Sequence, residues 1–135
     1  MAEIIISTDK NKLDIPLIYS FLSKSYWAKG RTSAQVEKSI ENSRCYGMYL
    51  NGEQIGFTRV VTDKVVFAYL MDVFIVENQR GKGYATQLMN AILEDEDIAQ
   101  VQNWFLRTND AQPFYAKFGF SELEHPERTM IRQVL

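Results

Sequence analysis

Two glycines alternate with two cations at Arg80-Gly81-Lys82-Gly83. Glycine has no Cβ atom, so the backbone at Gly81 and Gly83 can bend sharply and bring its N–H groups close to a ligand. An amphipathic stretch follows, and the first turn of a helix leaves N–H groups unpaired at the positive end of the helix dipole. Together with the charges of Arg80 and Lys82, the pattern predicts an anion site, and a diphosphate is the ligand that we expect.

A second interpretation of the same residues is an ordinary turn between a strand and a helix, with two solvated cations, because short glycine motifs are weak signals. Two well-known phosphate loops are excluded. The loop of nucleoside triphosphatases has Ser or Thr after its lysine, where this chain has Gly83. The dinucleotide-binding fingerprint has a third small residue where this chain has Thr86.

The elements on both sides of the glycines support a ligand site. Residues 65–76 carry a single charge, that of Asp72, and are rich in β-branched and aromatic side chains, as is typical of a strand buried on both faces. Apolar side chains recur with helical spacing after the glycines, at Ala85, Leu88, Met89, Ile92 and Leu93. The turn is therefore predicted to lie between a buried strand and the N-terminus of a helix.

This stretch resembles the acetyl-CoA motif of the GNAT superfamily of N-acetyltransferases, which reads Arg or Gln, two residues, Gly, one residue, Gly or Ala. Here the matching residues are Arg80, Gly83 and Ala85. Residues 111–120 are a second match, similar to the family's Ala, three residues, Tyr, three residues, Gly-Phe ending. One departure is Thr108, where many members have Asn, which puts in doubt a contact that this Asn sometimes makes.

The order of predicted elements is also that of the superfamily, and the resemblance covers nearly the whole chain. It implies an α/β (α+β) fold of the GNAT type, with a mixed, mostly antiparallel central sheet flanked by about four helices, in a single domain over residues 1–135.

Local signals predict where individual elements begin and end. Asp14 and Thr32 are predicted to cap two helices, and Asn51-Gly52 is predicted to form the turn of a hairpin. The acidic residues 94–97 are expected to form the loop that ends the third helix. Strands are predicted at 3–7, 44–50, 54–62, 65–76, 101–108, 120–123 and 129–134, and helices from 14, from 32, over 85–93 and over 111–118.

Composition excludes several classes of function. The 135 residues include 15 basic and 17 acidic side chains, so a net charge of −2 gives no reason to expect nucleic-acid binding. Cys45 is the only cysteine, which fits a reducing compartment, and it is predicted to be a small buried hydrophobe. Residues 1–4 do not resemble a signal peptide, and no apolar run is long enough to span a membrane, so we expect a cytoplasmic protein with no membrane partner.

The resemblance implies acetyl-CoA as cosubstrate and no metal. Its pantetheine arm is expected to lie along the central strand, bonded to backbone at Val73 and Ile75, where a bulge or splay would free N–H groups. Its diphosphate is expected on the N–H groups from Arg80 to Thr86. His125 has no Asp, Cys or second His near it in the sequence, so it is assigned to neither a metal site nor a triad. The predicted cofactor-binding residues are Val73, Ile75, Arg80, Gly81, Lys82, Gly83, Tyr84, Ala85 and Thr86.

Two residues are candidates for catalysis. Tyr115 matches the family's tyrosine near the leaving sulfur and is expected to act as general acid, because a phenol stays protonated at neutral pH. The alternative is a core tyrosine whose hydroxyl is satisfied. Asp72 is charged within an apolar strand, so it either serves as base, directly or through water, or pairs with Arg59 or another cation.

The acceptor site is expected between the first two helices and on the strands, at Tyr26, Trp27, Arg31, Arg59 and Tyr69, although Trp27 also fits a packing role. The implied function is direct acetyl transfer in a ternary complex to a primary amine of a small molecule, peptide or protein. The alternative is a sensor of the same fold that binds CoA or acyl-CoA without chemistry. A homodimer is left open.

Overall fold

The computed structural model describes residues 3–134. Met1 and Ala2, part of the stretch that does not resemble a signal peptide, lie outside the described residues, as does Leu135. The elements are β1 (Ile4–Ser7), η1 (Lys10–Lys12), α1 (Ile15–Lys24), α2 (Ser33–Glu41), β2 (Arg44–Leu50), β3 (Glu53–Thr62), β4 (Phe67–Ile75), η2 (Glu77–Gln79), α3 (Tyr84–Leu93), β5 (Asn103–Phe105), α4 (Gln112–Ala116) and η3 (Pro126–Arg128).

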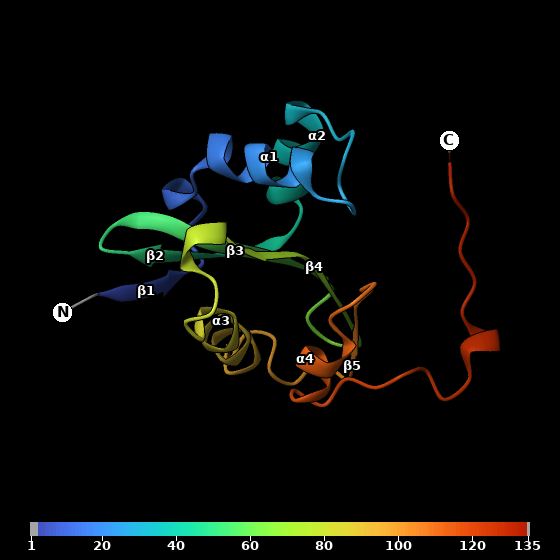
Figure 1. Ribbon diagram of the computed structural model, residues 1–135. Helices are drawn as coiled ribbons and strands as arrows, with labels where there is room; N and C mark the ends of the chain where they lie inside the picture. The colour runs from blue at the N-terminus through green and yellow to red at the C-terminus, as the bar shows by residue number, and fades with distance from the viewer. Residues whose placement is uncertain (1–2, 135) are drawn as a thin grey trace.

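One five-stranded sheet of order β1-β2-β3-β4-β5 organises these elements. Neighbouring strands are antiparallel except for β4 and β5, which are parallel. Helices α1 and α2 cover one face of the sheet, and α3 and α4 lie on the other side (Figure 1). The predicted mixed α/β fold with a mostly antiparallel sheet is therefore confirmed. No helix formed by residues 3–134 has the length and apolar character needed to cross a membrane.

Local signals set the starts of the first two helices. The Asp14 carboxylate accepts a hydrogen bond from the Leu17 N–H at the start of α1, with proline in the first turn. Thr32 and Gln35 form the predicted capping box at the start of α2, since each side chain bonds the backbone N–H of the other. Both caps satisfy N–H groups that a helix leaves unpaired, so these boundaries follow from adjacent residues alone.

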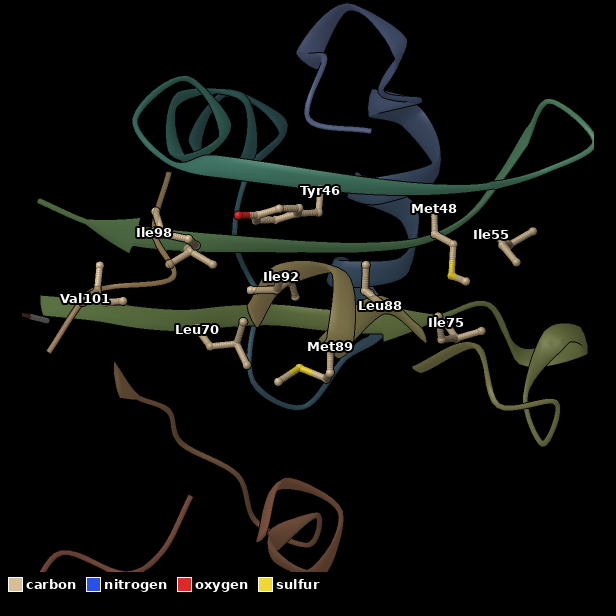
Figure 2. Packing of buried hydrophobic residues seen from close by; sticks show 12 residues of the cluster. Tyr46, Met48, Ile55, Leu70, Ile75, Leu88, Met89, Ile92, Ile98 and Val101 are labelled. Atoms are coloured by element: carbon tan, nitrogen blue, oxygen red, sulfur yellow. The ribbon is translucent and has the colours of Figure 1, made fainter. Parts of the chain in front are cut away.

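Two apolar cores lie on opposite faces of the sheet. Figure 2 shows the core beneath α3, where Leu88, Met89 and Ile92 face Tyr46 and Leu70 of the sheet. The other core joins α1 and α2 to the sheet through Ile18, Leu22, Val36, Ile40, Cys45, Phe57 and Phe74. Cys45 is buried as predicted, and burial raises the pKa of its thiol to about 11, so it is no nucleophile at neutral pH.

Two of the acidic residues after α3 form ion pairs with cations of the sheet and of one of its turns. Helix α3 ends at Leu93, as expected, and the Asp95 carboxylate then accepts hydrogen bonds from Arg44 Nε and the Tyr46 hydroxyl, both at 2.6 Å. Asp97 pairs with Arg44 Nη1 at 2.9 Å and with Lys64 Nζ at 2.8 Å. The run that is unfavourable at a helix end is therefore neutralised by cations of β2 and of the β3–β4 turn.

Three predicted strands differ from the structure. The strand predicted at 101–108 is limited to the three residues of β5, and the predictions of strands at 120–123 and 129–134 are wrong for a single copy of the chain. Residues 121–134 are exposed and contain only the turn η3. A strand needs a neighbour to complete its hydrogen bonds, and this segment runs away from the sheet of its own copy (Figure 1).

Candidate active site

A cavity of about 950 Å³ opens where the end of β4 meets the start of α3. Its floor is β4, and its walls come from α1, the α1–α2 connection, the glycine turn and α4. Elements distant in the sequence therefore meet at the glycine motif. The lining residues are Leu17, Ser20, Phe21, Lys24, Ser25, Tyr26, Trp27, Val73, Phe74, Ile75, Glu77, Gln79, Arg80, Gly81, Gly83, Tyr84, Ala85, Thr86, Phe114 and Tyr115.

The strand at the floor of the cavity is open on one edge. β4 pairs with β5 only as far as Tyr69 opposite Phe105, so from Leu70 to Ile75 this edge has no strand beside it within residues 3–134. Backbone groups on such an edge are free to bond an extended ligand. Val73 and Ile75, the predicted partners of the pantetheine arm, lie on this open part and line the cavity.

A β-bulge interrupts β4 at the same place. The register places Phe57 opposite Phe74 and Arg59 opposite Met71, so Thr58 faces two residues of β4. Asp72, one of these two, has φ = 57°, a left-handed value that costs energy for most residues but is tolerated by aspartate. The irregularity expected near Val73 is thus present.

The glycine turn presents a row of unpaired donors. Within residues 3–134, the backbone N–H groups from Gly81 to Thr86 make no hydrogen bond to protein atoms, and α3 has no side-chain N-cap. Gly81 and Gly83 have φ of 77° and 82°, and a Cβ added to either would meet no atom within 4 Å. Unpaired donors therefore lie beside open space at the positive end of a helix, which is an arrangement that binds phosphate.

Arg80 is fixed beside the cavity by two contacts. Its Nε donates a hydrogen bond to the Ile75 carbonyl oxygen at 3.1 Å, and its guanidinium lies 5.8 Å from the ring centroid of Phe21. Phe21 in turn stacks on Phe74 with centroids 4.0 Å apart. Lys82 lies outside the lining and donates to Gln79 Oε1 at 3.0 Å. The Arg80 guanidinium is therefore positioned beside the cavity by these contacts, whereas the Lys82 ammonium lies outside the residues that line it.

Tyr115 belongs to α4 and also lines the cavity. Its ring is half-buried between Phe114 and Phe120, with centroid distances of 5.1 and 6.1 Å. Burial, and to a smaller extent the neighbouring Tyr26 phenol, raise the pKa of Tyr115 to about 12. Its hydroxyl has no hydrogen-bond partner among the described residues. A protonated phenol with a free donor thus borders the cavity, which differs from a core tyrosine with a satisfied hydroxyl.

The Asp72 carboxylate is fully buried and held by three side chains. Arg59 Nε donates to it at 2.7 Å, Arg31 Nη1 at 2.9 and 3.0 Å, and Trp27 Nε1 at 2.9 Å. Of the two roles that the sequence leaves open, these contacts match pairing with Arg59 and a second cation. The cluster pins the α1–α2 connection to the bulge, so Asp72 also fixes where Trp27 lies.

The five predicted acceptor-site residues divide into three groups. Tyr26 and Trp27 line the cavity, and the Tyr26 hydroxyl accepts a hydrogen bond from the Asn109 N–H at 3.2 Å. Arg31 and Arg59 form ion pairs with the Asp72 carboxylate. Tyr69 lies outside the lining, at the far end of β4 beside Phe67, with ring centroids 6.3 Å apart.

The sequence did not point to several lining residues. Phe21 belongs to the apolar stripe of α1 and reads as core, and Lys24 reads as an ordinary cation near a helix end. Phe114 directly precedes Tyr115 and could have been found from that neighbour. Among residues 3–134, no group of three or more His, Cys, Asp or Glu side chains could hold a metal ion.

Known proteins are similar to this chain in sequence and in fold. A family model described as acetyltransferase (GNAT) domain matches residues 41–122. A Gibberella zeae protein named "Putative acetyltransferase" is 29% identical over 113 residues, which are 67% of this chain and 64% of that protein. The chain thus spans about two thirds of the length of this curated relative.

Solved structures share the fold over nearly the whole chain. A GNAT-family protein from Xanthomonas campestris pv. campestris is 39% identical and superposes with a TM-score of 0.95, covering 98% of this chain and 94% of its own. A Clostridium acetobutylicum structure described as a predicted acetyltransferase with acetyl-CoA is 14% identical, with a TM-score of 0.67 over 92% of each chain.

Proposed function

Because this chain belongs to the GNAT acetyltransferase family, we propose that it is an acetyl-CoA-dependent N-acetyltransferase acting on a primary amine of a small molecule, peptide or protein. We propose direct attack of the amine in a ternary complex, by one cytoplasmic domain covering residues 1–135. The observation that carries the proposal is the cavity itself. It joins a row of unpaired N–H donors at Gly81–Thr86 to a protonated Tyr115 along the open edge of β4.

The residues of the cavity fit CoA in three places. The N–H groups from Gly81 to Thr86 would hold the diphosphate, with Arg80 and Lys82 supplying positive charge. The free edge of β4 at Val73 and Ile75 would bond the amide groups of the pantetheine arm. Bound acetyl-CoA supplies the activated acyl group as a thioester. The Clostridium acetobutylicum neighbour, which contains acetyl-CoA, is consistent with this assignment.

Tyr115 is proposed as the acid at the departing sulfur. With a pKa of about 12, its phenol keeps its proton at neutral pH, whereas a free thiol has a pKa near 8.5. The phenol therefore need not transfer its proton fully, because a hydrogen bond from its hydroxyl to the sulfur already stabilises the departing thiolate. The hydroxyl has no competing partner among the described residues, so it is available to the ligand. A positioned acid of this kind typically contributes roughly 100- to 10,000-fold in rate.

The acceptor is proposed to enter beside Tyr26 and Trp27, which line the same cavity as Tyr115. An alkylammonium must lose a proton before it can attack the thioester. Asp72 is already bonded to Trp27 and two arginines, so we assign it a positioning role and expect the amine proton to leave through water. In this assignment Asp72 affects the acceptor through the placement of Trp27.

The direct test is release of CoA thiol from acetyl-CoA in the presence of a panel of primary amines, polyamines and peptides. Amine-dependent thiol release with a matching acetylated product is the expected result. Tight CoA binding without turnover on any amine would contradict the enzyme and favour the sensor, because binding needs only the donor row and the open strand.

A further inference from the structure

The C-terminal segment, residues 121–134, adds nothing to the core of its own copy. All its residues are exposed. Its backbone hydrogen bonds are local, from Arg128 N–H to the His125 oxygen and from Thr129 N–H to the Pro126 oxygen. Within residues 3–134, no backbone hydrogen bond joins it to the sheet. In Figure 1 the chain leaves α4 and ends far from the other elements.

The side chains of this segment are unsuited to a free tail. Leu123, Met130, Ile131 and Val134 are exposed by 46%, 94%, 63% and 85%. Residues 129–134 carry one charge and two β-branched apolar residues, which is why the sequence predicts a strand there. Exposed apolar side chains gathered in one segment indicate that another surface covers them.

A matching gap exists at the edge of the sheet. β5 pairs with β4 on one side, with Ala68 opposite Trp104, and among the described residues no strand lies on its other side. An unpaired edge presents N–H and C=O groups that readily accept a further strand. The edge of β5 can thus accept a further strand, and residues 129–134 have the composition of a strand but no partner in their own copy.

We propose that two copies of this chain exchange their C-terminal segments, so that residues 129–134 of each copy pair with the β5 edge of the other. The edge and the strand lie on one chain, yet the tail runs away from its own edge, so a second copy satisfies both at once. A reciprocal exchange makes a closed two-fold dimer with identical contacts on both sides. The strand predicted at 129–134 then forms between copies.

The outward path is shared by a crystallised relative. The Xanthomonas campestris protein aligns over 98% of the 135 residues, which leaves about three residues outside the alignment. Most of the segment is therefore included, and a TM-score of 0.95 requires it to follow the same course. Two chains that are only 39% identical thus have the same course for this segment, which is not expected of a tail that binds no surface.

The first test is the molar mass of the full chain, measured by light scattering after size exclusion over a dilution series. The expected mass is twice the 15.6 kDa of one chain. Ile131→Pro removes an N–H from the exchanged strand and should weaken the dimer at least about tenfold, whereas Ile131→Val keeps the strand and the dimer. Circular dichroism shows whether each variant is folded. A mass of one chain at every concentration, or a dimer that Ile131→Pro leaves equally tight, would overturn the proposal.

The second test shows which copy supplies the strand. Chains with Asn103→Cys are mixed with tagged chains with Gln133→Cys and treated with a thiol crosslinker that spans about 10 Å, roughly two strand spacings. Cys45 is 1% exposed and does not compete. Exchange predicts links between tagged and untagged chains, and covalent dimers of a variant that carries both substitutions. Links formed only inside the double variant would mean that the tail returns to its own edge. Neither test involves acetyl transfer, so both stand apart from the proposed function.

Discussion

Gly83 has a role in the backbone and a second role in the proposed CoA site. Its φ of 82° is in the left-handed region, where glycine lacks the strain that other residues experience, and it stands where a side-chain cap of α3 would otherwise be. The space that a Cβ would occupy is open, so the N–H groups of the first turn are accessible to a phosphate. The absence of a side chain thus allows the turn and leaves room for the diphosphate of the proposed function.

Gly83→Val should raise the dissociation constant of CoA at least about tenfold, because the side chain would stand in front of the N–H donors. Gly52→Val is the matched control, since Gly52 also has positive φ and no atom within 4 Å of an added Cβ, but lies in the β2–β3 hairpin. Both variants carry backbone strain, and only Gly83→Val should lose CoA in calorimetric titration. Equal CoA binding by the two would mean that the cofactor lies elsewhere.

Tyr115→Phe should lower turnover at least about tenfold while the affinity for acetyl-CoA stays nearly unchanged, because only the proton donor is removed. Tyr49→Phe is a control for loss of a hydroxyl. The Tyr49 hydroxyl is buried and without a hydrogen-bond partner among the described residues, so its removal should leave turnover unchanged and stability equal or higher. If Tyr115→Phe keeps full turnover, Tyr115 only packs α4 against the sheet.

At the scale of elements, the Asp72 cluster joins parts that share no regular secondary structure. The connection between α1 and α2 has no strand or helix to hold it, and Trp27 and Arg31 attach it to the bulge of β4. Arg59 of β3 completes the cluster and also donates to Ser43 Oγ at 3.1 Å. The part of the cavity wall that contains Trp27 is therefore held in place by one buried carboxylate and its partners.

Asp72→Asn keeps the shape and the tolerance for a left-handed backbone but removes the charge, leaving Arg59, which is 7% exposed, without a counter-ion. The free energy of unfolding should fall by about 3 kcal/mol, measured by urea denaturation. Asp97→Asn weakens two more exposed pairs, with Arg44 and with Lys64, and should cost less than about 1 kcal/mol. Equal losses in the two variants would show that the buried cluster adds no stability of its own.

At the scale of the whole molecule, helices cover both faces of the sheet, and ion pairs also join the segment after α3 to the sheet. Helix α3 has its apolar face on one core and its C-terminal carboxylates on β2, so helix and sheet are fastened twice. Burial alone would raise the pKa of Asp95, but hydrogen bonds from Arg44 and Tyr46 outweigh it, and the pKa lies below its ordinary value. The folded state therefore favours the ionised carboxylate.

This lowered pKa predicts acid sensitivity of the fold. Because the folded pKa of Asp95 lies below the unfolded one, its contribution is present above the ordinary aspartate range and is lost as pH falls through the folded value. Urea midpoints measured from about pH 5 to about pH 2 should fall more steeply for the unsubstituted protein than for Asp95→Asn. Parallel pH curves for the two proteins would mean that Asp95 gains nothing from Arg44 and Tyr46.

The sequence by itself determined what adjacent residues control. The caps at Asp14 and Thr32, the glycine turn and the helix after it depend on hydrogen bonds and φ values within a few residues, so their patterns are legible in the chain. The tertiary structure decided what depends on distant partners. Asp72 meets Trp27 and Arg31 across 45 and 41 residues, and packing alone selects such partners. The strand predicted at 129–134 has the right residues but no neighbour in its own copy, and the pairing that a strand requires lies outside local sequence.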